Sequence, residues 1–561
     1  MAPRAAIASG ALLLWGLPVA GGEPIDYGPE IRELSEFVRK EMDRGSIPCA
    51  SVALVDGGRI VWEAGFGFQD AGRRVPATGK TVYRVGSISK LFTALLALGL
   101  VERGALDLDR PIDRYAPELV FDDGSGTNPP VTLRQLLSHR AGIARESPVG
   151  SYFDDSEPGI ERTVRSFAGT RLVYRPGERT KYSNVGPTIA GYIVERLTGK
   201  PFSKLAREAL LDPLGMASSS FEPDREAIRK DLADAFMVDF EGRFFPAPKF
   251  SLGTIPAGNL YSSASDLARF LVALFAGGEI EGRRVIGREA LESMFRVQPP
   301  GTSAATGFGL GFYVGRFDGR RTVGHDGAVY GFASALLALP EEKLGAVVLN
   351  AVDCANGFDD KVARKALALL LAKKLGVRVA ALPEPISLHA SRLEEVCGFY
   401  AASGREVLVT PAAGGLRAEI LGAAHDLVAI AADRFVSDSR LSYGTVVRFL
   451  RGGDGRVRGL EAGGVEYARV ESPPEPETPR EWARFSGEYG WPHNVLLVRP
   501  RRGRLSARIE WFFEYPLEPE GGLSFRFPDY GLYEGERLVF VEGEGGRIVA
   551  ARVGPVEFPR R

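Results

Sequence analysis

Residues 90–101 form a run that is apolar on every face of a helix, and no other segment constrains the fold more. Because a helix without a polar face is stable only when other elements cover it, this run predicts a buried helix. Gly104 follows the run and predicts where the helix ends. The motif Ser87-Ile88-Ser89-Lys90 stands at its N-terminal end, so Ser87 and Lys90 are predicted to lie one turn apart near the same face.

Ser87, at the start of a buried helix, is placed for nucleophilic chemistry. Its backbone N–H has no acceptor within the helix and is free to face an oxyanion. Burial against leucine and phenylalanine should lower the pKa of Lys90, so that its amine can accept the proton of the Ser87 hydroxyl. The alternative is a helix-capping serine followed by a lysine that extends along the surface to solvent.

Tyr182-Ser183-Asn184 is a second motif, between a turn at 175–178 and an apolar helix that ends near Gly199. A tyrosine there can relay protons when nearby cations stabilise its phenolate. Asn184 carries both a donor and an acceptor with which to hold a substrate amide. The alternative is a core tyrosine followed by an asparagine that caps a helix.

His325-Asp326-Gly327 is a third motif, and it lies just before an apolar run at 332–339, so it is predicted in a strand or at a strand edge. Gly327 allows the backbone to come close to a ligand. His325 can bind a carboxylate or help to position a proton. The alternative is a structural histidine whose hydrogen bonds are satisfied within the fold.

Each motif occurs once, in this order, and together they resemble the serine β-lactamase and penicillin-binding-protein superfamily, specifically its class C-like branch. The resemblance extends from about residue 31 to residue 375 and includes 132–139 and 256–262. It implies an α+β fold, a helix-covered antiparallel β-sheet with a helical subdomain. We expect no cofactor and no metal.

By the same resemblance, Ser87 is the acylated nucleophile, and Lys90 and Tyr182 share the role of general base. The substrate-binding residues are those that touch the substrate amide, line the far wall and complete the oxyanion hole: Asn184, His325, Gly327 and Ala328. In the oxyanion hole, the N–H of Ala328 would act with that of Ser87. His139 matches a family histidine that is interpreted as structural.

True β-lactamases usually carry lysine where this chain has His325. His-x-Gly is more similar to DD-carboxypeptidases, D-aminopeptidases and related esterases of the branch. We therefore expect an exported serine hydrolase that works through acyl-Ser87 on D-amino-acid-containing peptides or amides. Two alternatives stay open: a carboxylesterase of the same family and, in a different class, a non-catalytic protein that binds cell-wall polymers or a partner.

Composition limits the partners. The chain has 70 Lys and Arg against 71 Asp and Glu, a formal net charge of −1, which gives no reason to expect nucleic acid, or a membrane beyond the export signal, as a partner. We expect a small-molecule or short-peptide substrate, and a homo-oligomer stays open. Arg4 followed by apolar residues 5–19 and small residues at 19–21 predicts a signal peptide over 1–21 and a periplasmic or secreted protein, with an uncleaved membrane anchor as the alternative.

The hydrolase domain is predicted over 25–378. Apolar spacing predicts a first helix at 31–42, strands between 308 and 349 and a last helix at 360–374. Ser263 and Asp266 predict another helix start. In the family fold the first and last strands are neighbours, which suggests a disulfide between Cys49 and Cys354.

Past residue 375 the sequence repeats itself. Tyr400 and Ile420 return as Tyr489 and Ile509, and later positions such as Phe449 return two residues further along. The copies predict two small all-β barrel-like modules, at 393–471 and 480–561, which resemble lipocalin-like C-terminal modules. Their aromatic residues are expected mainly in the modules' own cores, and the arginines at 499–504 on a solvated hairpin tip.

Overall fold

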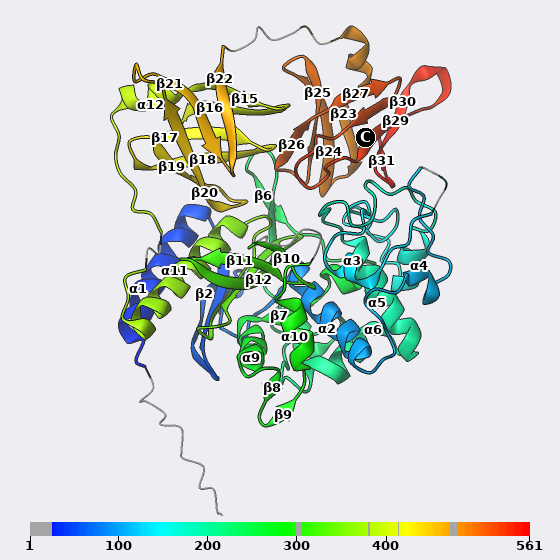
Figure 1. Ribbon diagram of the computed structural model, residues 1–561, viewed down its shortest axis with the longest axis vertical. Helices are drawn as coiled ribbons and strands as arrows, with labels where there is room; N and C mark the ends of the chain where they lie inside the picture. Colours follow the sequence, from blue (N-terminus) through cyan, green and yellow to red (C-terminus); the bar gives the residue numbers. More distant parts are fainter. Residues whose placement is uncertain are drawn as a thin grey trace, which may run out of the picture.

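The structure, a computed structural model, describes most of the chain: residues 25–124, 126, 128–298, 305–379, 382–412, 415–471, 477 and 479–561. The predicted signal peptide, residues 1–21, lies outside the described residues, as does most of the linker at 472–479. An N-terminal α+β domain lies at the bottom of Figure 1, and two all-β modules lie side by side above it. Within the described ranges, no helix has the length and apolar character needed to cross a membrane.

The N-terminal domain is built on an antiparallel sheet of eight strands, in the order β10-β11-β12-β13-β14-β1-β2-β3. Early and late segments of the domain meet at its centre, where Ser51 of β1 pairs with Leu349 of β14. Nearly every residue of these two strands is buried, because helices cover both faces of the sheet. The strands are β1 (Cys49–Asp56), β2 (Arg59–Asp70), β3 (Val75–Pro76), β10 (Gly307–Phe308), β11 (Tyr313–Phe317), β12 (Arg320–Val329), β13 (Phe332–Leu339) and β14 (Leu344–Asn350).

Helices α1 (Gly28–Gly45) and α11 (Asn356–Leu375) pack together, and α11 lies on β13 and β14. Helix α9 (Ala264–Phe275) packs on β1 and β14, and the Ser263 hydroxyl caps it by accepting the N–H of Asp266. The predicted first and last helices, the helix start at Ser263 and the helix-covered antiparallel sheet are confirmed.

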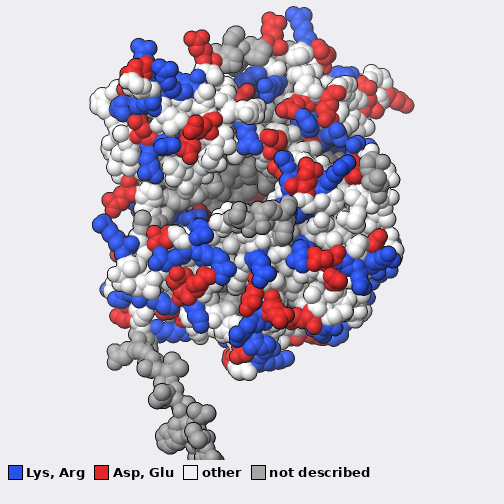
Figure 2. All heavy atoms as spheres, in the orientation of Figure 1, with Lys and Arg blue, Asp and Glu red and all other residues white. Residues whose placement is uncertain are grey.

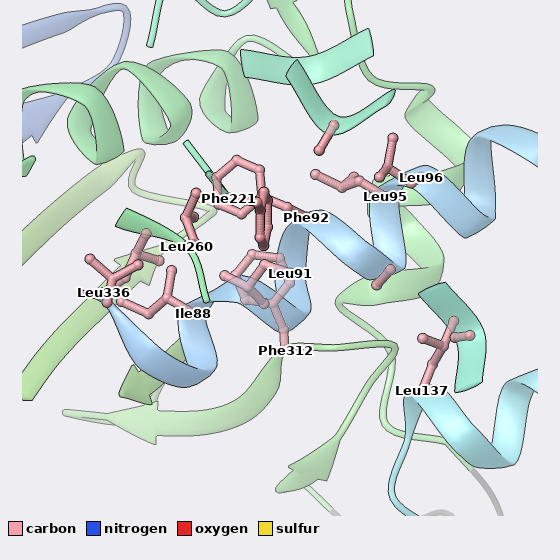
Figure 3. Packing of buried hydrophobic residues seen from close by; sticks show 14 of the residues in the cluster. Ile88, Leu91, Phe92, Leu95, Leu96, Leu137, Phe221, Leu260, Phe312 and Leu336 are labelled. Atoms are coloured by element: carbon pink, nitrogen blue, oxygen red, sulfur yellow. The ribbon is translucent and has the colours of Figure 1, made fainter. Parts of the chain in front are cut away.

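Helix α2 (Ser89–Glu102) is buried along almost its whole length, as its all-apolar sequence predicts. Figure 3 shows Ile88, Leu91 and Phe92 surrounded by side chains from other elements. Those labelled in the figure are Leu137, Phe221, Leu260, Phe312 and Leu336. A helix held from all sides is a rigid support for the residues at its N-terminus.

The remaining helices and short strands of this domain form the helical subdomain and its connections. They are α3 (Leu133–Leu137), α4 (Ile160–Arg165), α5 (Val185–Thr198), α6 (Phe202–Ala206), α7 (Glu226–Arg229), α8 (Ile255–Gly258), α10 (Arg288–Met294), β4 (Val82–Arg84), β5 (Phe236–Val238), β6 (Phe244–Pro246), β7 (Tyr261–Ser263), β8 (Glu279–Ile280) and β9 (Arg283–Arg284). Helix α2 packs against α5 and α8 of this set.

The first C-terminal module is a closed antiparallel barrel. Helix α12 (Ala390–Val396) precedes its strands, which are β15 (Gly398–Ala402), β16 (Arg405–Ala412), β17 (Gly415–Ile420), β18 (Ala423–Ala431), β19 (Arg434–Asp438), β20 (Tyr443–Arg451), β21 (Val457–Ala462) and β22 (Val465–Val470). Closure leaves no strand of the barrel with an unpaired edge.

The second module forms two sheets of four and five strands, β23–β26 and β27–β31. Their bounds are β23 (Gly487–Trp491), β24 (Asn494–Arg501), β25 (Arg504–Ile509), β26 (Phe513–Pro516), β27 (Glu518–Gly521), β28 (Ser524–Arg526), β29 (Arg537–Glu542), β30 (Ile548–Val553) and β31 (Val556–Pro559). The repeat is visible in its contacts, since the Tyr400 hydroxyl donates to the Val396 carbonyl and the Tyr489 hydroxyl to the Phe485 carbonyl, both at 2.7 Å.

The hypothesis of a disulfide between Cys49 and Cys354 is wrong, because all three cysteines are free thiols. Cys49 lies opposite Ala351, whose N–H donates to the Cys49 carbonyl, so Cys354 falls three residues beyond the pairing position. The Cys49 thiol lies 3.2 Å from the Tyr83 hydroxyl, and the Cys354 thiol donates to Asp353.

The expectation that the aromatic residues lie mainly in the modules' own cores holds for Phe513 and Tyr530, which pack in the core of the second module. Two corrections concern other residues of this module. Trp491, Trp511 and Phe512 pack against the hydrophobic core of the N-terminal domain instead of their own module. Arg501 and Arg502 both bind Glu419 of the barrel and help to line a cavity of about 470 Å³ between the modules, so the arginine cluster is an interface.

Charges of both signs are mixed over the face seen in Figure 2, as the near-zero net charge suggests. A depression opens in the same face between the modules and the N-terminal domain. The second module lies directly above the helical subdomain, and its packed aromatic residues fix it there.

Candidate active site

Ser87 lies in a short 3₁₀ turn, η1 (Gly86–Ile88), that leads directly into α2. The turn packs against β12, and a Cβ atom on Gly86 would lie only 2.9 Å from the Ala328 nitrogen. Gly86 also has a φ of +50°, a conformation that favours glycine. These constraints bring the backbone N–H groups of Ser87 and Ala328 to the same edge, where they can form an oxyanion hole.

The Ser87 hydroxyl has two partners of the expected kinds. Its Oγ lies 2.8 Å from Lys90 Nζ, and the Tyr182 hydroxyl donates to it at 2.8 Å. Residues 95 positions apart in the chain thus converge on one oxygen atom. The structure brings together the three residues that the motifs predicted as catalytic.

Lys90 is buried, with 1% of its surface exposed, and its Nζ has two further partners. It lies 2.9 Å from Asn184 Oδ1 and 2.9 Å from the Ala257 carbonyl. Burial, and then the charge of Arg145, hold the pKa of Lys90 well below its usual value. A neutral amine that donates to Asn184 and Ala257 keeps its lone pair for the Ser87 proton, as a general base requires.

Burial raises the pKa of Tyr182 to about 12, although the hydrogen bond to Ser87 and the charge of Arg145 oppose this rise. The phenol therefore stays protonated at neutral pH, which suits it to donate a proton and leaves Lys90 as the better-placed base. His139 stacks on the Tyr182 ring at 4.2 Å, and its Nδ1 accepts the N–H of Ser183. His139 therefore holds the tyrosine loop in place, the structural role expected of it.

Asn184 is bound at both ends of its amide within the protein. Its Oδ1 faces Lys90, and its Nδ2 donates to Glu146 Oε1 at 2.6 Å. The sequence predicted that this amide would hold substrate, whereas its present contacts fix the position of the Lys90 amine. Burial raises the pKa of Glu146 to about 7.

Packing requires a glycine at position 327. A Cβ atom at this position would lie 2.1 Å from the Val85 carbonyl oxygen and 2.4 Å from Ser334 Oγ. The carbonyl of Gly327 accepts a hydrogen bond from Asn356 Nδ2 at 2.9 Å. Strand β12 can therefore lie against the Ser87 turn only because residue 327 has no side chain.

His325 lies on the wall beside Tyr182 and is 8% exposed. Burial, reinforced by the charge of Lys90, lowers its pKa to about 3, so the imidazole is neutral. Its Nδ1 lies 2.6 Å from the Asp326 carbonyl, which can only accept, so Nδ1 carries the proton. Nε2 is then an acceptor, buried and without a partner among the described residues, and it suits an N–H donor better than a carboxylate.

The second module also reaches this site, which the sequence motifs did not indicate. Glu510 Oε1 lies 3.2 Å from Arg145 Nε, and Glu536 Oε1 lies 2.8 Å from Lys181 Nζ and accepts the N–H of Arg145 at 3.0 Å. These residues flank the tyrosine motif directly. Arg145, Glu146 and Glu510 are the functional candidates that the motifs missed.

A serine, a buried lysine and a tyrosine that meet beside a β-strand define a site of the serine-hydrolase type. The Beta-lactamase family model matches residues 34–371, and the chain belongs to this family.

Protein flp of Staphylococcus aureus (strain N315) is 25% identical over 320 residues, which are 57% of this chain. The alignment spans 62% of the length of that relative. The octameric penicillin-binding protein homologue from Pyrococcus abyssi has a similar structure, with a TM-score of 0.56 and 27% identity over 78% of this chain and 100% of that chain. A D-amino acid amidase from Ochrobactrum anthropi SV3 shares the fold, with a TM-score of 0.52 and 24% identity over 63% of this chain and 99% of that chain.

Proposed function

We propose that this protein is an exported serine hydrolase that acts through an acyl-Ser87 intermediate on peptides or amides that contain a D-amino acid. The observation that carries the proposal is the position of Ser87 Oγ, 2.8 Å from both Lys90 Nζ and the Tyr182 hydroxyl. The low pKa of Lys90 makes its amine a competent base near neutral pH.

In the first half of the reaction, Lys90 accepts the hydroxyl proton while Ser87 Oγ bonds to the substrate carbonyl carbon. The N–H groups of Ser87 and Ala328 stabilise the oxyanion. The C–N bond then breaks, the proton passes through Tyr182 to the leaving nitrogen, and the amine departs. Water attacks the resulting ester by the reverse proton path, releases the acid and restores Ser87.

His325 supports an amide as substrate. Its unprotonated Nε2 offers an acceptor beside Tyr182, and an amide or amine N–H can donate to it, whereas an ester linkage has no such donor. The amidase from Ochrobactrum anthropi, which shares the fold, is consistent with this class of substrate. The carboxylesterase remains the second candidate within the family, and the assembled Ser87 site favours either enzyme over a non-catalytic binding protein.

The test is intact-mass spectrometry after incubation with a fluorophosphonate and, separately, with a penicillin. The variant Ser87→Ala should lose both adducts, and Ser35→Ala on α1 is the matched control that should keep them. Steady-state rates with D- and L-phenylalanine p-nitroanilides and p-nitrophenyl butyrate then compare amide and ester substrates. Labelling or turnover that persists in Ser87→Ala would overturn the mechanism, and turnover of the ester alone would favour the esterase.

Export and assembly are separate proposals. Residues 1–21 should direct the chain to the periplasm, so deleting them should leave the protein in the cytoplasmic fraction of a bacterial host. The octameric relative from Pyrococcus abyssi supports a homo-oligomer, which light scattering after gel filtration measures directly.

A further inference from the structure

The second module reaches the active site through the tip of the hairpin formed by β25 and β26. Ile509 pairs with Phe513, so the tip consists of Glu510, Trp511 and Phe512. Glu510 is 8% exposed, and its Oε1 accepts hydrogen bonds from the Tyr533 hydroxyl at 2.5 Å and from Arg145 Nε at 3.2 Å. A carboxylate of the second module is thus buried against a cation of the hydrolase domain.

The first copy of the internal repeat has no carboxylate at the position of Glu510. In the first module Ile420, the equivalent of Ile509, pairs with Ala423 across a two-residue tip, Leu421-Gly422. Glu510 therefore stands in the place of Leu421, and Trp511 in the place of Gly422. The second copy has one more residue in its tip and an acid where the first has leucine.

The tip is also held in an unfavourable backbone conformation. Glu510 and Trp511 have φ values of +51° and +64°, in the left-handed region, and the first copy has the same conformation at its tip, with +50° at Leu421 and +84° at Gly422. The copies differ at the next position, where Trp511 takes the place of Gly422 although a positive φ favours glycine. Glu510 is held by Arg145 of the hydrolase domain and by Tyr533 of its own module, and Trp511 by packing in the hydrolase core and by its indole N–H, which donates to the His493 carbonyl at 2.8 Å.

From Glu510 a continuous set of contacts leads to the reacting atoms. Arg145 lies between Glu510 and Glu146, at 3.2 and 3.6 Å, with its guanidinium 5.7 Å from the centre of the Tyr182 ring. Glu146 accepts from Asn184, and Asn184 Oδ1 faces Lys90 Nζ. Arg145 Nη1 is buried and has no hydrogen-bond partner among the described residues, so Glu510 is the main constraint on this side chain.

We propose that Glu510 is a positioning residue of the active site: the hairpin tip of the second module holds Arg145 against Tyr182 and Glu146, and the catalytic centre is complete only with this module docked. The inference rests on the proposed function, because it assigns a role in the Ser87 reaction. It extends the site beyond the part of the chain that the family model matches, residues 34–371.

The charge of Arg145 lowers the pKa values of both Lys90 and Tyr182. Removing the negative charge of Glu510 leaves that positive charge less compensated, so the pKa of Lys90 should fall further. The other titratable groups that act on Lys90 or Glu510 are Glu146, His139, His325, Tyr152, Tyr330, Asp353, Cys354, Tyr515 and Tyr533. They are present in every variant below, so only the changed charge differs.

The experiment measures the rate of Ser87 labelling by a fluorophosphonate as a function of pH in the full-length protein. Because Lys90 must be neutral to act, the rate rises with pH through its pKa. Glu510→Gln should move this rise to lower pH by about 0.5–1 unit and reduce the maximal rate about tenfold as Arg145 loses its position. Arg145→Met should move the rise in the opposite direction.

Glu514→Gln is the matched control. Glu514 is a buried carboxylate of the same hairpin, but it binds Arg499 and Arg508 and faces the other module. Removing the charge of Glu514 disturbs the module but leaves the contacts of Arg145 intact. The pH at which the labelling rate of Ser87 increases should therefore be the same as in the wild type. Glu510→Asp keeps the charge and should return the pH profile toward that of the wild type. If Glu510→Gln does not fold, Glu510→Leu, which introduces the residue of the first copy, replaces it and should give the same shift.

A Glu510→Gln profile that superimposes on the wild type, or equal losses of rate in Glu510→Gln and Glu514→Gln without a shift in pH, would overturn the inference. These outcomes differ from a failure of the proposed function, in which the wild type itself is not labelled at Ser87.

Discussion

Replacing Gly327 with alanine tests how the oxyanion hole is assembled. The added Cβ atom would lie 2.1 Å from the Val85 carbonyl oxygen and 2.4 Å from Ser334 Oγ. Both neighbours are fixed, since the Ser334 hydroxyl itself donates to the Val85 carbonyl at 3.0 Å. Strand β12 must therefore move by about 1 Å to restore ordinary contact, and a displacement of this size can cost about 100-fold in rate.

The displacement carries Ala328, the next residue of the strand, away from the Ser87 turn. Losing one oxyanion donor costs about 10²–10³-fold in rate, and overpacking of this kind costs about 1–3 kcal/mol of folding free energy. We therefore expect Gly327→Ala to be labelled by a fluorophosphonate at least about 100-fold more slowly and to unfold at lower urea concentration.

The control is Gly58→Ala, in the turn between β1 and β2. A Cβ atom there meets nothing within 4 Å. Rates come from intact-mass spectra of samples quenched over time, and stability comes from circular dichroism in urea. If Gly327→Ala were labelled as fast as the wild type, the amide of Ala328 would have no part in the oxyanion hole and the reasoning would be refuted.

Burial raises the pKa of Glu146 from 4.5 to about 7, so the folded chain holds this proton more tightly than the unfolded chain. As pH rises from 4.5 to 7, the free energy of unfolding of the wild type, measured in urea, should fall by up to about 3 kcal/mol relative to that of Glu146→Gln. A difference between the two unfolding free energies that stays constant over that pH range would contradict the raised pKa. The imidazole of His325, whose pKa is about 3, should stay neutral with its proton on Nδ1 from about pH 5 to 8 in ¹H–¹⁵N spectra, and a charged ring at neutral pH would refute the assignment. All three cysteines should titrate as thiols in the denatured, unreduced protein, and finding only one would show that a disulfide forms after all.

Local patterns accounted for much of the fold and marked the three residues whose side chains meet at Ser87 Oγ. The helix after Ser87 follows from an apolar run that has no polar face, and the start of α9 follows from the Ser263 cap, since both depend on residues close in sequence. The motifs marked Ser87, Lys90 and Tyr182, and the structure brings their side chains together. The resemblance to a known family supplied the long-range pairing that no local pattern encodes.

The rest of the site depends on contacts between distant segments. Nothing local marks Arg145 and Glu146, because an arginine beside a glutamate is common on any surface. In the structure Arg145 binds Glu510, which lies 365 residues further along. The tautomer of His325 depends on its position beside the Asp326 carbonyl, which composition does not reveal.

One signal in the sequence could have located Glu510. The two copies of the repeat keep one spacing up to Ile420 and Ile509 and lose it before Phe449 and its counterpart, so the copies diverge in the segment that begins at the tip. Here the second copy has the longer tip, and this tip carries the contact of Glu510 with Arg145.

The two modules dock in series. The tip of the first copy lies on the second module, where Glu514 donates its N–H to the Gly422 carbonyl, and the tip of the second copy lies in the hydrolase domain. During synthesis Ser87 is therefore made early, and Glu510, whose carboxylate lies against Arg145, is made much later. Since domains generally fold as units from the N-terminus during synthesis, a growing chain carries Ser87 in an unfinished setting. Until the second module has folded onto the hydrolase domain, the growing chain therefore lacks the Glu510 carboxylate beside Arg145.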